Sequence, residues 1–282
     1  MVLDRSRIQY KTHEQVRLMR RAGLVVADAL DAVRAALRPG VTTGELDAVA
    51  EDVIRTAGAR PSFLGYGGGR GAPPYPGTLC ISVNDEIVHG IPGPRVVAAG
   101  DVVSVDCGAI LAGWHGDSAF TTVVPGPDGE PDPEDVRLVD TCEQALWRGI
   151  AAAVAGERLN AIGAAVEDFV GGRYGLVEEY GGHGIGTQMH QEPHVLNYRT
   201  RDRGPRMRPG LCIAVEPMLT LGEPATAELD DGWTVVTVDG RHAAHWEHSM
   251  AVLEDGAWVL TARDGGEQAL RALGARFSPL AD

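Results

Sequence analysis

Hydrophobic residues in the first part of the chain recur every three or four positions, which is the period of an α-helix. The capping box Thr12–Gln15 begins the first such stretch, and the helix-breaking pair Pro39–Gly40 ends it. A second capping box, Thr42–Glu45, begins another amphipathic stretch that stops at Gly58. The pattern therefore predicts two consecutive helices in this part of the chain.

After a loop, the hydrophobic pattern changes to a period of two. The segment Gly65–Gly77 is rich in glycine and proline, which predicts the loop. Alternating apolar and polar residues then predict strands in CISV (80–83), RVVAAGDVVSVDCGAIL (95–111) and AFTTVVPG (119–126). Short turns join these strands, so we expect them to form an antiparallel sheet.

The second half of the chain repeats this order of helices followed by strands. Asp132 and Pro133 form an acidic helix start with proline at the first helical position, and a shorter helix begins after Asn160 and runs to about Gly171. Further strands are predicted in LVEEY (176–180), LCIAVEPML (211–219), WTVVTVD (233–239), HWEHSMAVL (245–253) and AWVLTA (257–262).

The order helices, strands, helices, strands indicates the fold class. It favours an α+β fold, in which an antiparallel sheet has helices packed on one face, over a doubly wound parallel sheet. It also suggests two similar halves, although the sequence contains no fixed-period repeat. Because no linker of Ser, Pro and Gly separates the halves, we expect residues 1–282 to form a single domain with a short N-terminal helical lead-in and a C-terminal tail.

Composition and charge exclude several classes of function. With 44% hydrophobic and 23% charged residues, the 282-residue chain is neither disordered nor fibrous. Its formal net charge of −14 would repel phosphate groups, which argues against specific nucleic-acid binding and anionic membranes. The four cysteines form no CxxC pair, and neither a leader-like start nor a run of ~18 apolar residues occurs. We therefore expect a cytoplasmic protein that is neither exported nor membrane-spanning.

Four acidic residues lie within apolar, strand-like segments, where a carboxylate is costly unless it is paired or bound to a metal. They are Asp106, Asp117, Glu216 and Glu247, and His183 lies in the glycine-rich run GGHGIG. Four carboxylate charges balance two divalent ions, whereas a lone structural zinc prefers sulfur and nitrogen donors. The oxygen-rich set fits Mn, Fe, Co or Zn without choosing among them. Any single acid could instead be solvated or pair with an arginine, but this explanation is difficult to apply to all four.

Five segments that contain these residues resemble the signature segments of type I methionine aminopeptidases, the smaller branch of the pita-bread metallopeptidases. They are SVNDEIVHGIP, SVDCGAILAGWHGDSAF, GGHGIGTQMHQEPHV, IAVEPML and HWEHSMAV, and the resemblance extends from about Ile8 to Leu260. It implies the pita-bread fold and removal of the initiator methionine from nascent proteins when the second residue is small. No zinc-finger extension is expected before the catalytic region, and the insertion of the type II branch is not evident between His190 and Glu216, as in the short bacterial form.

The resemblance also implies a role for each candidate ligand. Asp106 would chelate one ion, Asp117 and Glu247 would bridge both, and His183 with Glu216 would complete the other. Glu216 would also accept a proton from the attacking water, a role that is chemically reasonable for a carboxylate beside two ions.

Two histidines are implied to act on the substrate without binding metal. His89 and His190 would face the scissile amide and stabilise the developing oxyanion or the leaving nitrogen. Without the resemblance, His89 beside Gly90 is interpreted as a solvated turn residue. His245 and His248, which flank Glu247, are expected to be supporting or surface residues.

A pocket of aromatic and sulfur-containing residues is implied for the methionine side chain, since a thioether contacts aromatic rings favourably. Tyr66, Cys80 and Trp233 occupy the corresponding positions. Phe63 stands where the bacterial form often has cysteine, and Met189 stands where it often has phenylalanine. Tyr75, in the glycine- and proline-rich loop, is a further candidate.

Two alternatives and several partners remain open at this stage. A proline-directed aminopeptidase or prolidase-like enzyme shares the fold, as does a non-catalytic binding paralogue. The arginine-rich run Arg199–Arg208 is either a solvated loop or a contact with the ribosome surface. We expect a monomer that acts on the N-terminal methionine of nascent polypeptides and binds no membrane.

Overall fold

The computed structural model describes residues 8–69, 72–126 and 131–281. Helices α1 (His13–Ala36) and α2 (Thr43–Thr56) both begin with the expected capping box, in which a threonine side chain accepts a hydrogen bond from the backbone three residues on. Helices α3 (Pro133–Ala152), α4 (Asn160–Val170) and α5 (Glu267–Ala272) follow later in the chain. None of these helices has both the length and the apolar character needed to cross a bilayer.

The largest sheet in the described part of the chain contains nine antiparallel strands. Its main path runs β1-β6-β7-β16-β11-β9-β10, with β4 paired to β6 and β17 paired to β16. These strands are β1 (Arg60–Pro61), β4 (Leu79–Val83), β6 (Val102–Leu111), β7 (Trp114–Val123), β9 (Gly182–Gly184), β10 (Gln191–Val195), β11 (Cys212–Val215), β16 (Glu247–Val252) and β17 (Ala257–Val259).

Smaller sheets stand at the edges of this main sheet. Strands β8 (Gly175–Leu176), β12 (Met218–Thr220) and β15 (Ala243–His245) form one, and β5 (Glu86–Val88), β13 (Thr226–Glu228) and β14 (Val235–Thr237) form another. The hairpin of β2 (Gly67–Gly69) and β3 (Ala72–Pro74) is the third.

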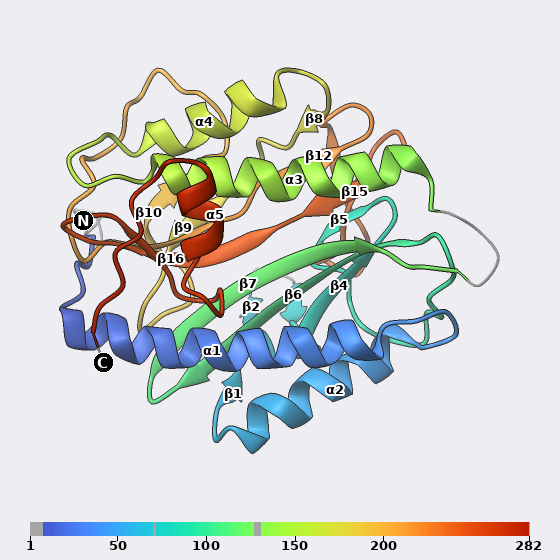
Figure 1. The fold of residues 1–282 in the computed structure, drawn as a ribbon. Coiled ribbons are helices and arrows are strands. Elements are labelled where there is room, and N and C mark those ends of the chain that lie inside the picture. Colours follow the sequence, from blue (N-terminus) through green and yellow to red (C-terminus); the bar gives the residue numbers. More distant parts are fainter. Residues whose placement is uncertain (1–7, 70–71, 127–130, 282) are drawn as a thin grey trace.

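The helices cover one face of the curled main sheet, as the order of elements predicted (Figure 1). Along β6, Val103, Val105 and Cys107 pack into a core with α1 and α2. Because side chains alternate across a strand, Asp106 and Gly108 face the opposite side. Along β11, Ile213 and Val215 likewise pack with α3. The uncovered concave face is therefore available for polar side chains from both halves.

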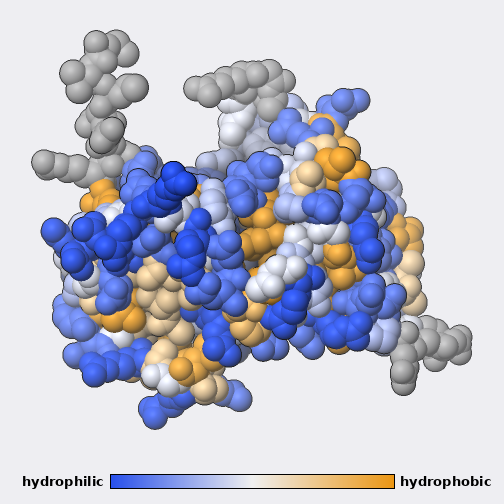
Figure 2. Space-filling view, turned by 90° about the horizontal axis from the view of Figure 1, so that it is seen from above, coloured by the Kyte–Doolittle hydropathy of each residue, from blue (hydrophilic) through white to orange (hydrophobic). Residues whose placement is uncertain are grey.

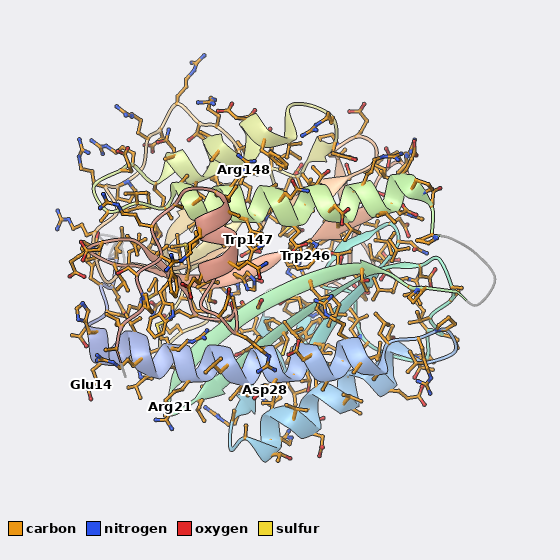
Figure 3. The ribbon with its side chains drawn as sticks, viewed as in Figure 1. Glu14, Arg21, Asp28, Trp147, Arg148 and Trp246 are labelled. Atoms are coloured by element: carbon orange, nitrogen blue, oxygen red, sulfur yellow. The ribbon has the colours of Figure 1, made fainter. Side chains whose placement is uncertain are left out.

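Trp246 joins the halves on the helical side, between β15 and β16. It packs against the core of α1 and α2, against the core under α3 and β11, and against the core between α3 and α4. Figure 3 shows it with Trp147 in the region between α3 and the sheet. Viewed from the α4 side, the surface is mostly hydrophilic, with small groups of hydrophobic residues in its hollows (Figure 2).

Several sequence expectations require correction. Segment 65–77 contains the β2–β3 hairpin, which a hydrogen bond from Trp233 Nε1 to the Pro73 carbonyl oxygen (2.9 Å) supports from a distant part of the chain. Residues 95–101 precede β6, and Val97 pairs instead with the turn before α2. Segment 176–180 is irregular after Leu176, the strand predicted in 233–239 is confined to Val235–Thr237, and α4 includes Asn160 without any side-chain cap.

Candidate active site

A row of four residues crosses the concave face of the main sheet on adjacent strands. Cys80 lies opposite Asp106, Asp106 lies opposite Ala119, and Ala119 lies opposite Glu247. The methyl group of Ala119 is small, so it leaves space between the carboxylates on either side of it. Strand register alone therefore places Asp106 and Glu247 around one volume.

Asp117 adds a third carboxylate from the same face of β7. It lies opposite Gly108, one diagonal step from both Asp106 and Glu247. Ser249 fixes its backbone, because the hydroxyl accepts from the Asp117 amide (3.1 Å) and donates to the Asp117 carbonyl oxygen (2.8 Å). A side chain at Gly108 would contact Phe63 and Met189, so glycine keeps this part of the floor open.

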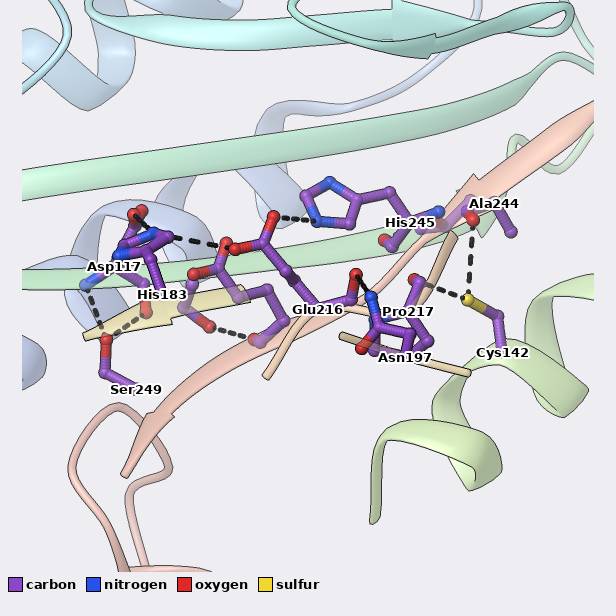
Figure 4. A network of polar contacts seen from close by, with 12 residues as sticks. Asp117, Cys142, His183, Asn197, Glu216, Pro217, Ala244, His245 and Ser249 are labelled. Carbon is purple, nitrogen blue, oxygen red and sulfur yellow. Dashed lines mark hydrogen bonds and ion pairs between the residues drawn. The ribbon is translucent and has the colours of Figure 1, made fainter. Parts of the chain in front are cut away.

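Glu216 follows β11 directly and extends into the same volume. Asn197 holds its backbone by donating to the Glu216 carbonyl oxygen (3.0 Å). Figure 4 shows the Glu216 carboxylate between the imidazoles of His183 and His245. The corresponding distances are 3.5 Å from Oε1 to His183 Nε2 and 3.9 Å from Oε2 to His245 Nε2.

His183 is held in one tautomer by its own strand. Its Nδ1 donates to the Gly184 carbonyl oxygen (3.0 Å), which can only accept, so Nε2 keeps a free lone pair. Burial and the nearby His190 lower the pKa of His183 to about 3, so the ring is neutral. Its Nε2 lies 3.7 Å from Asp117 Oδ2 and 3.5 Å from Glu216 Oε1. These separations are typical of ligands that surround one ion, and the Nδ1 bond is the usual means of orienting a ligating histidine.

The donor set fits divalent metal ions. One oxygen of each of Asp106, Asp117, Glu216 and Glu247 is buried without a hydrogen-bond partner among the described residues. Ligand atoms of Asp117, His183 and Glu247 lie within 4.8 Å of one another, as do those of Glu216, His245 and Glu247. Unsatisfied buried carboxylates are strongly destabilising, so their clustering indicates a site for cations.

Like charge and burial determine the ionisation of the cluster. Burial raises the pKa of Asp106 to about 7. Burial and the neighbouring carboxylates raise the pKa values of Asp117, Glu216 and Glu247. Each carboxylate is thus difficult to ionise until positive charge is placed among them.

A cavity of about 160 Å³ adjoins the cluster. It is lined by all five candidate ligands and by residues that the sequence assigned to the substrate, namely Phe63, Tyr66, Tyr75, Cys80, His89, His190 and Trp233. Tyr75 and Trp233 pack edge to face with ring centroids 5.2 Å apart. Met189 is not among the lining residues; it is buried near Phe63, behind Gly108.

His190 faces this cavity with its orientation set by Tyr66. The Tyr66 hydroxyl is hydrogen-bonded to His190 Nδ1, and burial raises the pKa of this hydroxyl. Burial also lowers the pKa of His190, which favours the neutral ring. The ring lies beside His183, with the two ring centroids 4.3 Å apart.

His89 lines the cavity from a strained turn after β5. Its φ of 61° lies in the left-handed region, and Gly90 follows it in close contact with β4, where a Cβ would lie 2.3 Å from the Ile81 oxygen. Burial lowers the pKa of His89 to about 4, so it is also neutral. The alternative of a solvated turn residue is wrong, because His89 packs against Tyr180 and Trp233.

Sequence reasoning underestimated His245. Its Nε2 is buried without a partner in the described structure and points toward Glu216, from a strand separate from that of Glu247. Its position two residues before Glu247 is the one feature of the sequence that could have indicated a place near the metal ligands. His248, by contrast, bonds Ser118 Oγ (3.0 Å) and Thr261 Oγ1 (2.9 Å) and contacts Trp147 of α3, as expected of a supporting residue.

Comparisons with known proteins agree on one family. The model of metallopeptidase family M24 matches residues 17–254. Methionine aminopeptidase 1 of Mycobacterium tuberculosis is 49% identical over 251 residues, which cover 86% of this chain and 91% of the relative.

Solved structures differ in how similar they are to this chain. The methionine aminopeptidase of Thermotoga maritima superimposes with a TM-score of 0.85 at 36% identity, covering 91% of this chain and all of the other. The prolidase of Pyrococcus furiosus has a TM-score of 0.69 at 20% identity, covering 90% of this chain and 65% of the prolidase. The prolidase therefore shares the fold, and its likeness extends no further.

Replacing Asp106 should weaken metal binding but increase the stability of the metal-free protein at neutral pH. With a chelator present, the Asp106 carboxyl has a pKa of about 7 in the folded protein and ~3.9 in the unfolded chain, so ionising it favours unfolding as the pH rises between these values. We expect Asp106→Asn to gain stability relative to the original protein as the pH rises through this range, by on the order of 4 kcal/mol between acid pH and pH 7.5. The buried histidines titrate in both proteins, so their contributions cancel.

Urea unfolding at pH 5.0, 6.0 and 7.5, together with equilibrium dialysis against Mn²⁺, measures both effects. Asp106→Asn should bind less metal, whereas the exposed α3 variant Asp140→Asn should bind as much as the original protein. A stability difference that does not change with pH would contradict the conclusion that burial raises the pKa of Asp106.

Proposed function

The chain belongs to metallopeptidase family M24, and we propose that it is a methionine aminopeptidase that removes the initiator methionine from nascent proteins when the second residue is small. The observation that carries this proposal is the cavity in which the five candidate ligands adjoin an aromatic and sulfur-lined pocket. This chain matches 91% of the length of the relative from Mycobacterium tuberculosis.

The ligand set supports two divalent ions. Asp106 would hold one, His183 and Glu216 would hold the other, and Asp117 and Glu247 would bridge them. Ions bound there supply a Lewis acid for the scissile carbonyl and lower the pKa of a coordinated water. We propose Mn, Fe, Co or Zn, since oxygen donors with one imidazole accept each of these.

The protein's own groups would then handle protons and orientation. Glu216 would accept the proton of the attacking water, a role that is open to a carboxylate beside the ions. His190 donates from Nε2 to the oxyanion that develops on the scissile carbonyl, and Tyr66 fixes that donor. His89, which also lines the cavity, supports the leaving nitrogen.

Substrate selection follows from the size and lining of the cavity. Phe63, Tyr75, Cys80 and Trp233 offer ring edges and sulfur to the methionine side chain, and Met189 packs behind them. A volume of about 160 Å³ leaves little room for a second side chain once methionine is bound, which favours small second residues. A proline-directed activity would need space for a constrained ring at that point, and the intact ligand set argues against a non-catalytic binding paralogue.

The proposal extends to the domain organisation, oligomeric state, location and ribosome contact of the protein. Residues 1–282 are proposed to act as one catalytic domain, and all candidate ligands come from one chain, which is consistent with a functional monomer. Four buried free cysteines suit a reducing cytoplasm. We also propose contact with the ribosome through the loop Arg199–Arg208, in which Arg201 and Arg203 are exposed.

Peptide hydrolysis tests the main proposal. Chelated protein reconstituted with Mn²⁺, Co²⁺, Fe²⁺ or Zn²⁺ should cleave Met-Ala-Ser and leave Met-Lys-Ser and Ala-Pro-Ser intact, because only the first combines a thioether with a small second residue. Release of the first amino acid, followed by mass spectrometry, gives the rates. Preferential cleavage of Ala-Pro-Ser would assign the chain to the proline-directed branch, and no cleavage with any metal would favour a binding protein.

Two substitutions separate the metal ligands from the oxyanion donor. Glu216→Gln should lose turnover of Met-Ala-Ser by about 10³-fold or more and should bind less metal. His190→Ala should lose about 10²- to 10³-fold with unchanged metal content, because only the N–H donor is removed. Elemental analysis by plasma mass spectrometry measures the metal, and the exposed His13→Ala is the matched control. Equal metal loss in both variants would refute this division of roles.

The ribosome contact predicts salt-dependent binding. Arg199 is already paired with Asp168 (2.6 Å), so Arg201→Glu with Arg203→Glu should remove most of the free charge of the loop. We expect this double variant to lose co-sedimentation with ribosomes at low salt while it cleaves Met-Ala-Ser normally. Unchanged co-sedimentation would identify the run as a solvated loop.

A further inference from the structure

Two surface hollows continue outward from the catalytic cavity. The first, of about 400 Å³, shares His183 and His190 with that cavity and is also lined by Gln9, Gln188, Gln191, Glu192 and His194. The second, of about 250 Å³, shares Glu192 and His194 with the first. Because each hollow shares side chains with the next, the three volumes lie next to one another between the candidate metal centre and the surface. We call the two hollows together the outer track.

The inner part of the outer track is lined by amide side chains. Lys11 donates to Gln191 Oε1 (3.0 Å), and Gln191 Nε2 donates to Gln9 Oε1 (3.2 Å). Lys11 itself is 5% exposed and lies beneath Gln191, so it orders this wall without lining it. A wall of ordered amides with Gln188 beside it can contact any peptide backbone without regard to sequence.

The charged residues along the outer track are acidic. Glu192 lies where the two hollows meet, and Asp202 lies in the second hollow with Leu159, Leu196 and Thr200. Both acids are exposed, and no Lys or Arg lines either hollow in the described part of the chain.

Two of the neighbouring arginines are bound elsewhere. Arg199 donates to both carboxylate oxygens of Asp168 at 2.6 Å, and Arg206 donates to the Gly156 carbonyl oxygen at 2.6 Å. Arg201 and Arg203 flank Asp202 and are exposed, but they line neither hollow, so the carboxylates that line the outer track are Glu192 and Asp202.

We propose that the outer track binds the substrate chain beyond its second residue, and that Glu192 and Asp202 make the enzyme favour basic over acidic residues there. This inference rests on the proposed aminopeptidase function. A free N-terminus in the catalytic cavity leaves the rest of the substrate to pass His190, and the outer track begins at that residue. Partly exposed charge pairs of this kind have modest strength, so the expected effect is a preference and not an absolute requirement.

Three amidated pentapeptides test the proposal, namely Met-Ala-Ser-Ser-Ser, Met-Ala-Lys-Lys-Ser and Met-Ala-Glu-Glu-Ser. Amidation removes the terminal carboxylate, so only the third and fourth residues differ in charge. We expect the original protein to cleave the lysine peptide with a kcat/KM about five- to tenfold above that of the glutamate peptide. The ratio should approach one at high salt, where exposed charges are screened.

Charge-reversed variants locate the preference. Glu192→Lys and Asp202→Lys should each reduce or invert the ratio of the lysine-peptide rate to the glutamate-peptide rate. The α2 variant Glu51→Lys, which makes the same change on the helical side of the sheet, should keep both the original ratio and the original rate on the serine peptide. Glu192→Gln provides a milder variant if a reversal impairs folding, which circular dichroism would reveal.

The outcomes distinguish failure of the outer-track proposal from failure of the proposed aminopeptidase function. Cleavage of the serine peptide with a lysine-to-glutamate ratio near one, or with a ratio that neither reversal changes, would overturn the outer track and leave the aminopeptidase function standing. Failure of the original protein to cleave the serine peptide would overturn both.

Discussion

Four carboxylates are buried together around one cavity, and the repulsion between them when they ionise has to be offset by cations. The scaffold around them makes this arrangement possible. Ala119 keeps Asp106 and Glu247 apart by only a methyl group, and Ser249 fixes the backbone of Asp117 from the neighbouring strand. Helices on the opposite face provide the apolar core that holds the strands in this register.

The histidines around the cluster show how neighbours give one residue type different functions. His183 donates from Nδ1 to a carbonyl and is left with a lone pair that suits a metal, whereas His190 is hydrogen-bonded at Nδ1 to a tyrosine hydroxyl, which when it donates leaves His190 an N–H that suits an oxyanion. Both rings are neutral because burial lowers their pKa values. The division of labour thus depends on the bonding partner of the ring nitrogen that faces away from the site.

The sequence was informative where local rules decide structure. The capping boxes predicted α1 and α2, and acids within apolar strands marked the candidate ligands, because both signals are contained in short segments. It was uninformative where distant residues meet. The β2–β3 hairpin depends on Trp233, which is 160 positions from Pro73, and the orientation of His190 depends on Tyr66, which is 124 positions away. The proximity of His245 to Glu216 likewise arises from pairing between β12 and β15.

The origin of the ligands in both halves of the fold has a consequence for the lifetime of the protein. Asp106 and Asp117 come from the half under α1, whereas His183 and Glu216 come from the half under α3. Ions held between them act as a cross-link, and binding to the folded state alone makes opening of the halves rarer. Copies without ions open more often and are exposed to proteases for longer. The amount of this protein in a cell should therefore follow the supply of its metal, even at constant synthesis.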